Sequence, residues 1–246
     1  MKKWMKTAIF LVTLLSLTSA SHAYIETFDS NNAGWTTYTI GSSSDSGYIT
    51  GTDSAFTSTG GNPGGYISGS VANSAVNRLY GFEAPAGAFG DLSGKTLTVD
   101  YQSSGTVTGP AGVTTGPSVR FYIGVSGNYF VSSTSWDANT NGSWTTHALT
   151  VDTSNFVAWP NQNSGSLTLA QVAASSGYYV GLLFSNGAFS SNIDLGFTST
   201  NGATISIDNF GTPSAVPIPA AVWLLGSGLV GLVGLKKKLN HRRTPI

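Results

Sequence analysis

The sequence predicts an all-β protein: an antiparallel β-sandwich of the jelly-roll type, with an N-terminal signal helix and a single C-terminal transmembrane helix. Short runs of β-branched and aromatic residues, bounded by Gly, Asn or Pro, recur at roughly even spacing through residues 24–213. An apolar stretch flanked by lysines stands at each end of the chain. We therefore divide the chain into residues 1–23, 24–213 and 214–246, and the middle part, of about 190 residues, is long enough for one sandwich with a sizeable core.

The first 23 residues read as a secretory signal peptide. Three lysines precede the apolar run Ala8–Leu17, which is too short to cross a membrane. Small residues occupy the two positions that signal peptidase reads, Ser21 and Ala23. We expect signal peptidase to cut between Ala23 and Tyr24 and the rest of the chain to pass through the inner membrane.

Strands are expected wherever apolar and polar residues alternate or β-formers cluster. The expected strands are Tyr24–Phe28, Trp35–Ile40, Tyr66–Val71, Leu79–Glu83, Thr96–Gln102, Val119–Val125, Asn128–Ser132, Thr145–Thr150, Tyr178–Phe184, Ile193–Thr198 and Thr204–Phe210. Alternation in Leu97–Tyr101 and in Ile205–Asp208 predicts one buried face. The mixed pattern of Val119–Ile123 predicts a central strand.

Two local features complete the expected secondary structure. Gly127-Asn128 reads as the turn of a hairpin that joins two of the expected strands. Leu167–Ala174 is the one helical stretch of the body, with Ser166 as its expected N-cap.

Charge and cysteine content exclude several functions. The body carries all eleven acidic residues against three basic ones, a net charge of −8 that is hidden by the whole-chain value of zero. A surface of this sign has no basic patch for phosphate, so we expect no nucleic-acid partner. The absence of cysteine excludes disulfides and thiol catalysis.

Catalytic groups are scarce. His147 is the only histidine of the body, and Glu26 and Glu83 are its only glutamates. A serine triad would lack a recognisable nucleophile elbow. A secreted hydrolase would need an Asp pair meeting in a cleft, and no local spacing marks one. We expect the protein not to be an enzyme.

Exposed aromatic rings beside polar groups could bind sugars. The candidates are Trp35, Trp136, Trp144, Trp159 and Tyr129. Trp136 and Trp144 flank a polar loop and are the expected ligand-binding pair. The alternative is that these tryptophans are core or rim residues, and for Trp35 we expect the core.

The end of the chain has a distinctive order: Val216-Pro217-Ile218-Pro219-Ala-Ala-Val-Trp-Leu-Leu-Gly-Ser-Gly-Leu, then the basic stop Lys236, Lys237 and Lys238. The uncharged run 218–235 would span roughly 27 Å as a helix, just enough to cross a bilayer core. The segment resembles the PEP-CTERM sorting signal, in the variant that reads VPLPA, although Ile218 stands where Glu is usual. The resemblance implies cleavage by an exosortase near Pro217–Pro219. An ordinary membrane anchor is the alternative.

A second resemblance lies in the body. Gly64–Ile67, Tyr80–Pro85, Phe89–Ser93 and Lys95–Tyr101 are similar to the laminin B (domain IV) pattern, which implies an extracellular β-sandwich. The residues also make physical sense alone. Pro85 should end a strand, glycines 87 and 90 should permit tight turns, Phe89 should bury, and Asp91 should cap the next turn.

The first and last expected strands, with Glu26 and Asp208, resemble the opening and closing strands of jelly-roll carbohydrate-binding modules. In those modules the two strands lie side by side and acidic residues near them often hold calcium. The resemblance implies that Glu26 and Asp208 are ligands of a structural Ca²⁺. Two alternatives remain open: solvated or hydrogen-bonded strand-end carboxylates, or a loop site at Asp45 and Asp53.

These features together predict an exported structural or adhesive protein of the bacterial cell surface or exopolysaccharide matrix, sorted by exosortase. The alternative is a lectin-like carbohydrate-binding module whose partner is the exopolysaccharide. The further alternative is a secreted hydrolase.

Overall fold

The structure is a computed structural model that describes residues 24–40, 49–71, 78–108, 118–159, 163–185, 198–199 and 202–213. All of them belong to one compact unit, Ala23–Pro213. The expected signal peptide and the expected sorting segment with a transmembrane helix lie outside the described residues, as does most of the expected strand Ile193–Thr198. Within the described ranges, no helix is long and apolar enough to cross a membrane.

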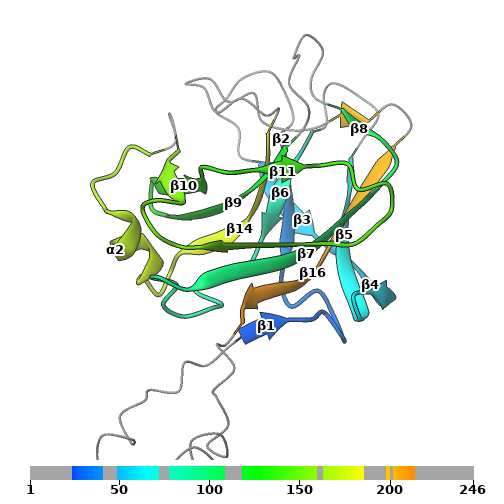
Figure 1. Cartoon of the computed structure of the whole chain (residues 1–246), viewed down its shortest axis with the longest axis horizontal. Coiled ribbons are helices and arrows are strands. Elements are labelled where there is room, and N and C mark those ends of the chain that lie inside the picture. The colour runs from blue at the N-terminus through cyan, green and yellow to red at the C-terminus, as the bar shows by residue number, and fades with distance from the viewer. Residues whose placement is uncertain are drawn as a thin grey trace, which may run out of the picture. The chain divides into compact units, whose positions relative to one another are not determined.

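The described residues form two antiparallel sheets that pack face to face (Figure 1). Sheet A has the order β12 (Thr145–Thr150), β7 (Thr96–Ser104), β16 (Ala203–Thr212), β5 (Gly64–Val71) and β4 (Ala55–Gly61), and β1 (Tyr24–Glu26) also pairs with β16. Sheet B has the order β13 (Phe156–Ala158), β10 (Asn128–Ser132), β9 (Ser118–Val125), β14 (Tyr179–Ser185), β6 (Arg78–Glu83), β2 (Thr36–Ile40) and β3 (Ile49–Asp53), and β11 (Trp136–Asp137) also pairs with β9. A small ladder joins β8 (Val107–Thr108) to β15 (Thr198–Ser199).

The core lies between the sheets because alternate residues of each strand point inward. Leu97, Val99 and Tyr101 of β7 are fully buried, as the alternation in their sequence predicts. Four aromatic rings, Phe28, Trp35, Phe89 and Phe210, contact one another edge to face or tilted at the end of the core near β1. Trp35 is therefore a core residue, as expected.

The expected central strand is confirmed. β9 lies between β10 and β14, and every residue from Ser118 to Gly124 is buried. Its inward residues belong to the core, and its outward residue Tyr122 is covered by Trp159, so both faces of the strand are buried and its sequence pattern is mixed.

Two local expectations need correction. The β9–β10 hairpin turns at Ser126 and Gly127, both with positive φ, and Asn128 is already the first residue of β10. The helix α2 is shorter than expected, Leu169–Ala173, and its N-cap is Thr168 instead of Ser166. Thr168 forms a reciprocal capping box with Gln171, a signal present in the sequence that outweighs a serine further upstream.

The segment after β6 behaves as its residues predict. Phe89 is 5% exposed, and the Asp91 carboxylate accepts a hydrogen bond from the Ser93 N–H at 2.8 Å. Gly87 and Gly90 both have positive φ. Strands β3, β4, β8, β11 and β13 have no counterpart in the sequence-based expectation, because their Gly-, Ser- and Thr-rich or very short sequences carry little apolar alternation.

Candidate functional site

The outer face of sheet B, which points away from the core, carries an aromatic and polar surface. We call it the tyrosine face and define it by Tyr129 on β10, Tyr122 on β9, Tyr179 on β14 and Glu83 on β6. Directly paired residues of an antiparallel sheet share a face, so the register shows which side chains are neighbours. Two rows of paired residues form the surface.

The first row runs across three strands. Gly124 of β9 is paired with Tyr129 on one side and Tyr179 on the other. A Cβ at Gly124 would lie 2.6 Å from Cε1 and 2.9 Å from Cγ of Tyr129, so the ring of Tyr129 lies over the glycine. Tyr179 is 40% exposed. The row therefore presents two tyrosine rings with no side chain between them.

The second row is polar at its centre. Tyr122 and Glu83 lie on either side of Gly181 of β14, and the Tyr122 hydroxyl donates a hydrogen bond to the Glu83 carboxylate across that glycine. Both side chains are buried. Beyond Tyr122, the same row continues through Val131 of β10 to Val157 of β13, which is 39% exposed.

Further contacts hold this surface in place. The Trp159 ring, 1% exposed, packs edge to face against Tyr122 and Tyr129. The guanidinium of Arg120, one row further along β9, donates to the carbonyls of Ser132 and Ser133 at 2.7 and 2.8 Å. Burial, followed by the charge of Glu83 and the proximity of Tyr179, raises the pKa of Tyr129, so its hydroxyl stays protonated at neutral pH.

The buried residues of this surface are separate from the main core. Of the buried hydrophobic residues, four stand outside the core cluster: Tyr122, Val131, Trp159 and Leu183. All four belong to the tyrosine face or the residues beside it. The face thus has a buried floor and exposed aromatic and apolar groups along one side.

The structure separates the expected pair Trp136 and Trp144. Trp136 packs inward, against Phe121 and, in a parallel stack, against His147. Trp144 lies on the outer face of sheet A, where its ring packs against Tyr66 and its N–H donates to the Gly60 carbonyl at 3.1 Å. The two indoles therefore cannot form one site.

The structure also places Glu26 and Asp208 in different hydrogen-bond networks. Glu26 accepts from the Tyr24 hydroxyl and the Phe28 N–H. Asp208 accepts from the backbone N–H groups of Asn62 and Asn209. Among the described residues, no group of three or more His, Cys, Asp or Glu side chains could hold a metal ion. Asp45 lies outside the described residues.

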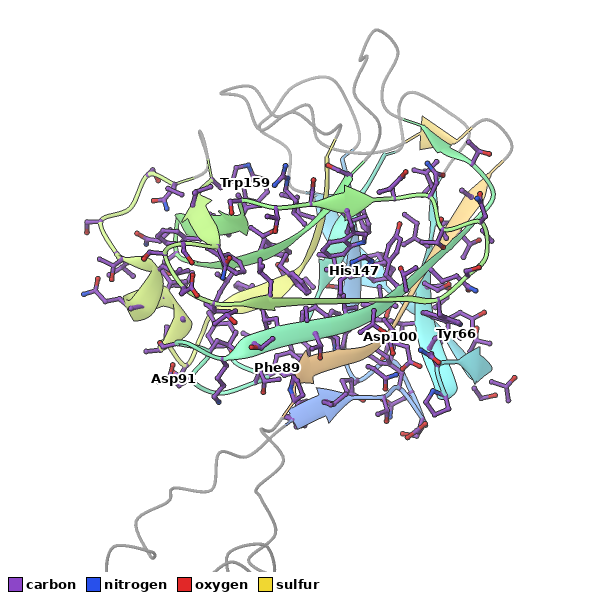
Figure 2. The ribbon with its side chains drawn as sticks, in the orientation of Figure 1. Tyr66, Phe89, Asp91, Asp100, His147 and Trp159 are labelled. Atoms are coloured by element: carbon purple, nitrogen blue, oxygen red, sulfur yellow. The ribbon has the colours of Figure 1, made fainter. Side chains whose placement is uncertain are left out.

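One carboxylate pair does meet. Asp100 and Asp208 are directly opposite each other on β7 and β16, two inner strands of sheet A, and Figure 2 labels Asp100. Asp100 accepts hydrogen bonds from Thr146, Asn62 and Asn209. Burial raises the pKa of Asp208 to about 6, with smaller contributions from the charges of Asp100 and Asp29.

Each oxygen of this pair already accepts a hydrogen bond from the chain itself. The donors come mainly from the β4–β5 turn at Asn62 and from the bulge at Asn209, so the pair fastens that turn to the middle of sheet A. This arrangement explains the two aspartates as structural groups and gives no position for a substrate.

Sequence reasoning named Tyr129 and Trp159 but missed Tyr122, Tyr179 and Glu83. The signal that could have found them runs across strands. Gly124 follows Tyr122 by two residues on β9, and Gly181 of β14 is paired with Tyr122. The two glycines leave room for the tyrosine rings. That relation needs the strand order, which the sequence does not reveal.

No family model and no curated protein matches the sequence. Solved structures with a similar arrangement include carbohydrate-binding modules. The family 11 module of the cellulosomal cellulase Lic26A-Cel5E of Clostridium thermocellum is 16% identical and covers 80% of this chain and 97% of its own, with a TM-score of 0.45. A family 11 module from the same organism, in complex with a β-1,3-1,4-mixed-linked tetrasaccharide, is 16% identical and covers 80% of this chain and 98% of its own, with a TM-score of 0.46. The N-terminal cellulose-binding domain of Cellulomonas fimi β-1,4-glucanase C is 19% identical and covers 78% of this chain and 95% of its own, with a TM-score of 0.37. At these identities and scores, the similarity concerns strand arrangement alone.

Proposed function

We propose that the protein is an exported polysaccharide-binding module and that the tyrosine face is its binding surface. The observation that carries the proposal is the row Tyr129–Gly124–Tyr179, in which two rings stand on one face with no side chain between them. Sugar rings present apolar C–H faces that pack on aromatic rings, and their hydroxyls need hydrogen-bonding groups nearby. The hydroxyls of Tyr179, which is exposed, and of Tyr129, which is half-buried, supply such groups in the same row.

Fixed side chains support this function. A binding surface gains affinity when its groups need not be ordered on binding. Tyr129 is held by Gly124 beneath it and by Trp159 at its edge, and Tyr122 is held by Glu83 and Trp159. The platform is therefore ordered in the free protein.

The test is affinity electrophoresis of the full-length protein in gels that contain soluble polysaccharides, including the exopolysaccharide of the native host. Calorimetry with oligosaccharides of any polysaccharide that retards the protein then gives the dissociation constant. We expect Tyr179→Ala to weaken binding roughly 5- to 30-fold, since losing one aromatic platform costs about 1–2 kcal/mol.

The matched control is Tyr66→Ala, because Tyr66 is a half-buried tyrosine on the outer face of the other sheet. It should leave binding unchanged. Loss of binding in Tyr66→Ala but not in Tyr179→Ala would move the site to sheet A and refute the proposal. Failure of every polysaccharide to retard the wild-type protein would refute it as well.

Delivery to the cell surface is a separate proposal that rests on the sequence alone. The motif at Val216, Pro217 and Pro219 and the basic stop at residues 236–238 support sorting by exosortase after passage through the inner membrane. The intact mass of the mature protein from the native host tests it. A chain that ends near Pro217–Pro219 is expected, whereas a chain that retains residues 220–246 would show an ordinary membrane anchor.

A further inference from the structure

The charge of the body favours a ligand of the opposite sign. Residues 24–213 carry eleven acidic and three basic residues, a net charge of −8. A surface of this sign attracts cationic ligands and repels anionic ones before any contact forms. Whether this preference reaches the tyrosine face depends on the charges that lie nearest to its two exposed rings.

Of the two charged residues on the tyrosine face and beside it, Glu83 is nearer to the first row, which holds those rings. The row of Glu83 lies two residues further along β14, about 7 Å from the first row. Arg120 lies four residues from Gly124 on β9, about 14 Å away, and its guanidinium donates to two backbone carbonyls. The Tyr122 hydroxyl donates to the Glu83 carboxylate, which favours the ionised form of that carboxylate.

The hydroxyl of Tyr129 responds to this negative charge. Burial raises the pKa of Tyr129 most, and the charge of Glu83 raises it further. A carboxylate that disfavours a phenolate at this position favours a positive group there through the same Coulomb interaction. At about 7 Å one such charge changes affinity about 3-fold in bulk water and more near a protein surface.

The rings themselves also favour a cation. The face of a tyrosine ring is negative, and it attracts an ammonium group that lies within about 6 Å of the ring centre. An exposed contact of this kind changes affinity about 2- to 5-fold. Tyr179 is 40% exposed and Tyr129 is half-buried, so both rings can meet a ligand. Arg120 is only 4% exposed and presents little positive charge to that ligand.

We propose that the tyrosine face binds a cationic polysaccharide built of amino sugars, whose ammonium groups lie close to the rings of Tyr129 and Tyr179 and within the field of Glu83. This substrate class rests on the function proposed above and belongs to the same site. A neutral chain of the same shape would pack on the rings without the electrostatic attraction, and a chain of uronic acids would be repelled.

The test compares three tetrasaccharides that share one β-1,4-linked backbone. They are cellotetraose, the N-acetylglucosamine tetramer and the glucosamine tetramer, which carry a hydroxyl, an acetamido group and an ammonium group at carbon 2. Titration calorimetry with the full-length protein at mildly acidic pH, where the amine is protonated, gives each dissociation constant. We expect the glucosamine tetramer to bind about tenfold more tightly than cellotetraose, and added salt to reduce that difference.

Glu83→Gln and Asp137→Asn form a matched pair of variants, because each removes one negative charge and keeps a hydrogen-bond acceptor. The new amide oxygen can still accept from the Tyr122 hydroxyl in the first variant and from a backbone N–H in the second. Asp137 is paired with the start of β9, six residues from Gly124 and about 20 Å away, beyond the screening length at physiological salt.

Glu83→Gln should weaken binding of the glucosamine tetramer about 3- to 10-fold more than it weakens binding of cellotetraose. Asp137→Asn should leave the affinity for all three tetramers unchanged. The comparison of ligands on the wild-type protein decides the outcome if Glu83→Gln does not fold.

Equal affinity of the wild-type protein for the glucosamine tetramer and cellotetraose would overturn this inference. The function proposed above would then still hold, provided that Tyr179→Ala weakens binding of both tetramers. Equal losses in Glu83→Gln and Asp137→Asn would also overturn it, because the charge of the whole body, and not that of the tyrosine face, would attract the ligand. If no tetramer and no polysaccharide binds, the proposed function itself fails.

Discussion

The substitution Gly124→Ala tests the arrangement on which the tyrosine face depends. Ordinary contacts begin near 3.4 Å, whereas the new methyl group would lie 2.6 Å from Cε1 of Tyr129, 0.8 Å too close, and the overlap with Cδ1 is larger. The Tyr129 ring must therefore leave its place between Gly124 and Trp159. Overpacking of this kind costs about 1–3 kcal/mol.

A double-mutant cycle isolates that contact. In a Tyr129→Ala background the clash is absent, and Gly124→Ala should then be neutral or stabilising by about 0.5–1 kcal/mol, because alanine restricts the unfolded chain. Gly177→Ala is the control, since a Cβ there meets open space and its φ is not positive.

Urea unfolding of the four proteins gives the coupling, which we expect to be about 2 kcal/mol. Equal costs of Gly124→Ala in the two backgrounds would mean that the Tyr129 ring does not lie over Gly124. The same substitution should also weaken polysaccharide binding, because it moves the ring that forms the platform.

Three other results are expected. Because burial raises the pKa of Asp208 to about 6, the folded protein keeps a proton that the unfolded chain releases above about pH 4. The free energy of unfolding should therefore fall by about 1–3 kcal/mol as pH rises from 4 to 7, and Asp208→Ala should flatten that slope in urea titrations. Thr168→Ala should cost about 1 kcal/mol through loss of the capping box, whereas Ser166→Ala should cost almost nothing; a thermal unfolding series that ranks them in the opposite order would restore the N-cap to Ser166. Trp35→Ala should cost about 3–5 kcal/mol because the ring fills the core beside Phe28, and Trp144→Ala, on the outer face, should cost far less in the same unfolding assay.

Local chemistry made much of the fold predictable. Leu97, Val99 and Tyr101 point inward because a strand alternates its faces, and this alternation is visible in the sequence. The turn at Gly90 and the cap at Asp91 likewise depend on near neighbours alone. Strands such as β4, with small polar residues on both faces, carry no such pattern and exist because β5 offers them a partner.

The tyrosine face was less predictable, because it depends on residues from several strands. Trp136 and Trp144 are close in sequence, yet one points into the sandwich and the other lies over sheet A. Conversely, Tyr122 and Glu83 are distant in sequence and meet across a glycine of a third strand. A pattern read along one strand cannot contain a relation that runs across three.

The position of β16 has a mechanical consequence. This last described strand lies inside sheet A, with β7 on one side and β5 on the other, and β1 beside its C-terminal end. Hydrogen bonds between strands run perpendicular to them, so a pull along β16 from its C-terminal end loads the ladders to β7 and β5 together, in shear. β1 shares only three residue pairs with β16, and a pull that separates Tyr24 from Thr212 would open those pairs one at a time. A module tethered after β16 should therefore bear tension well, while a module tethered before β1 should begin to unravel under a small force.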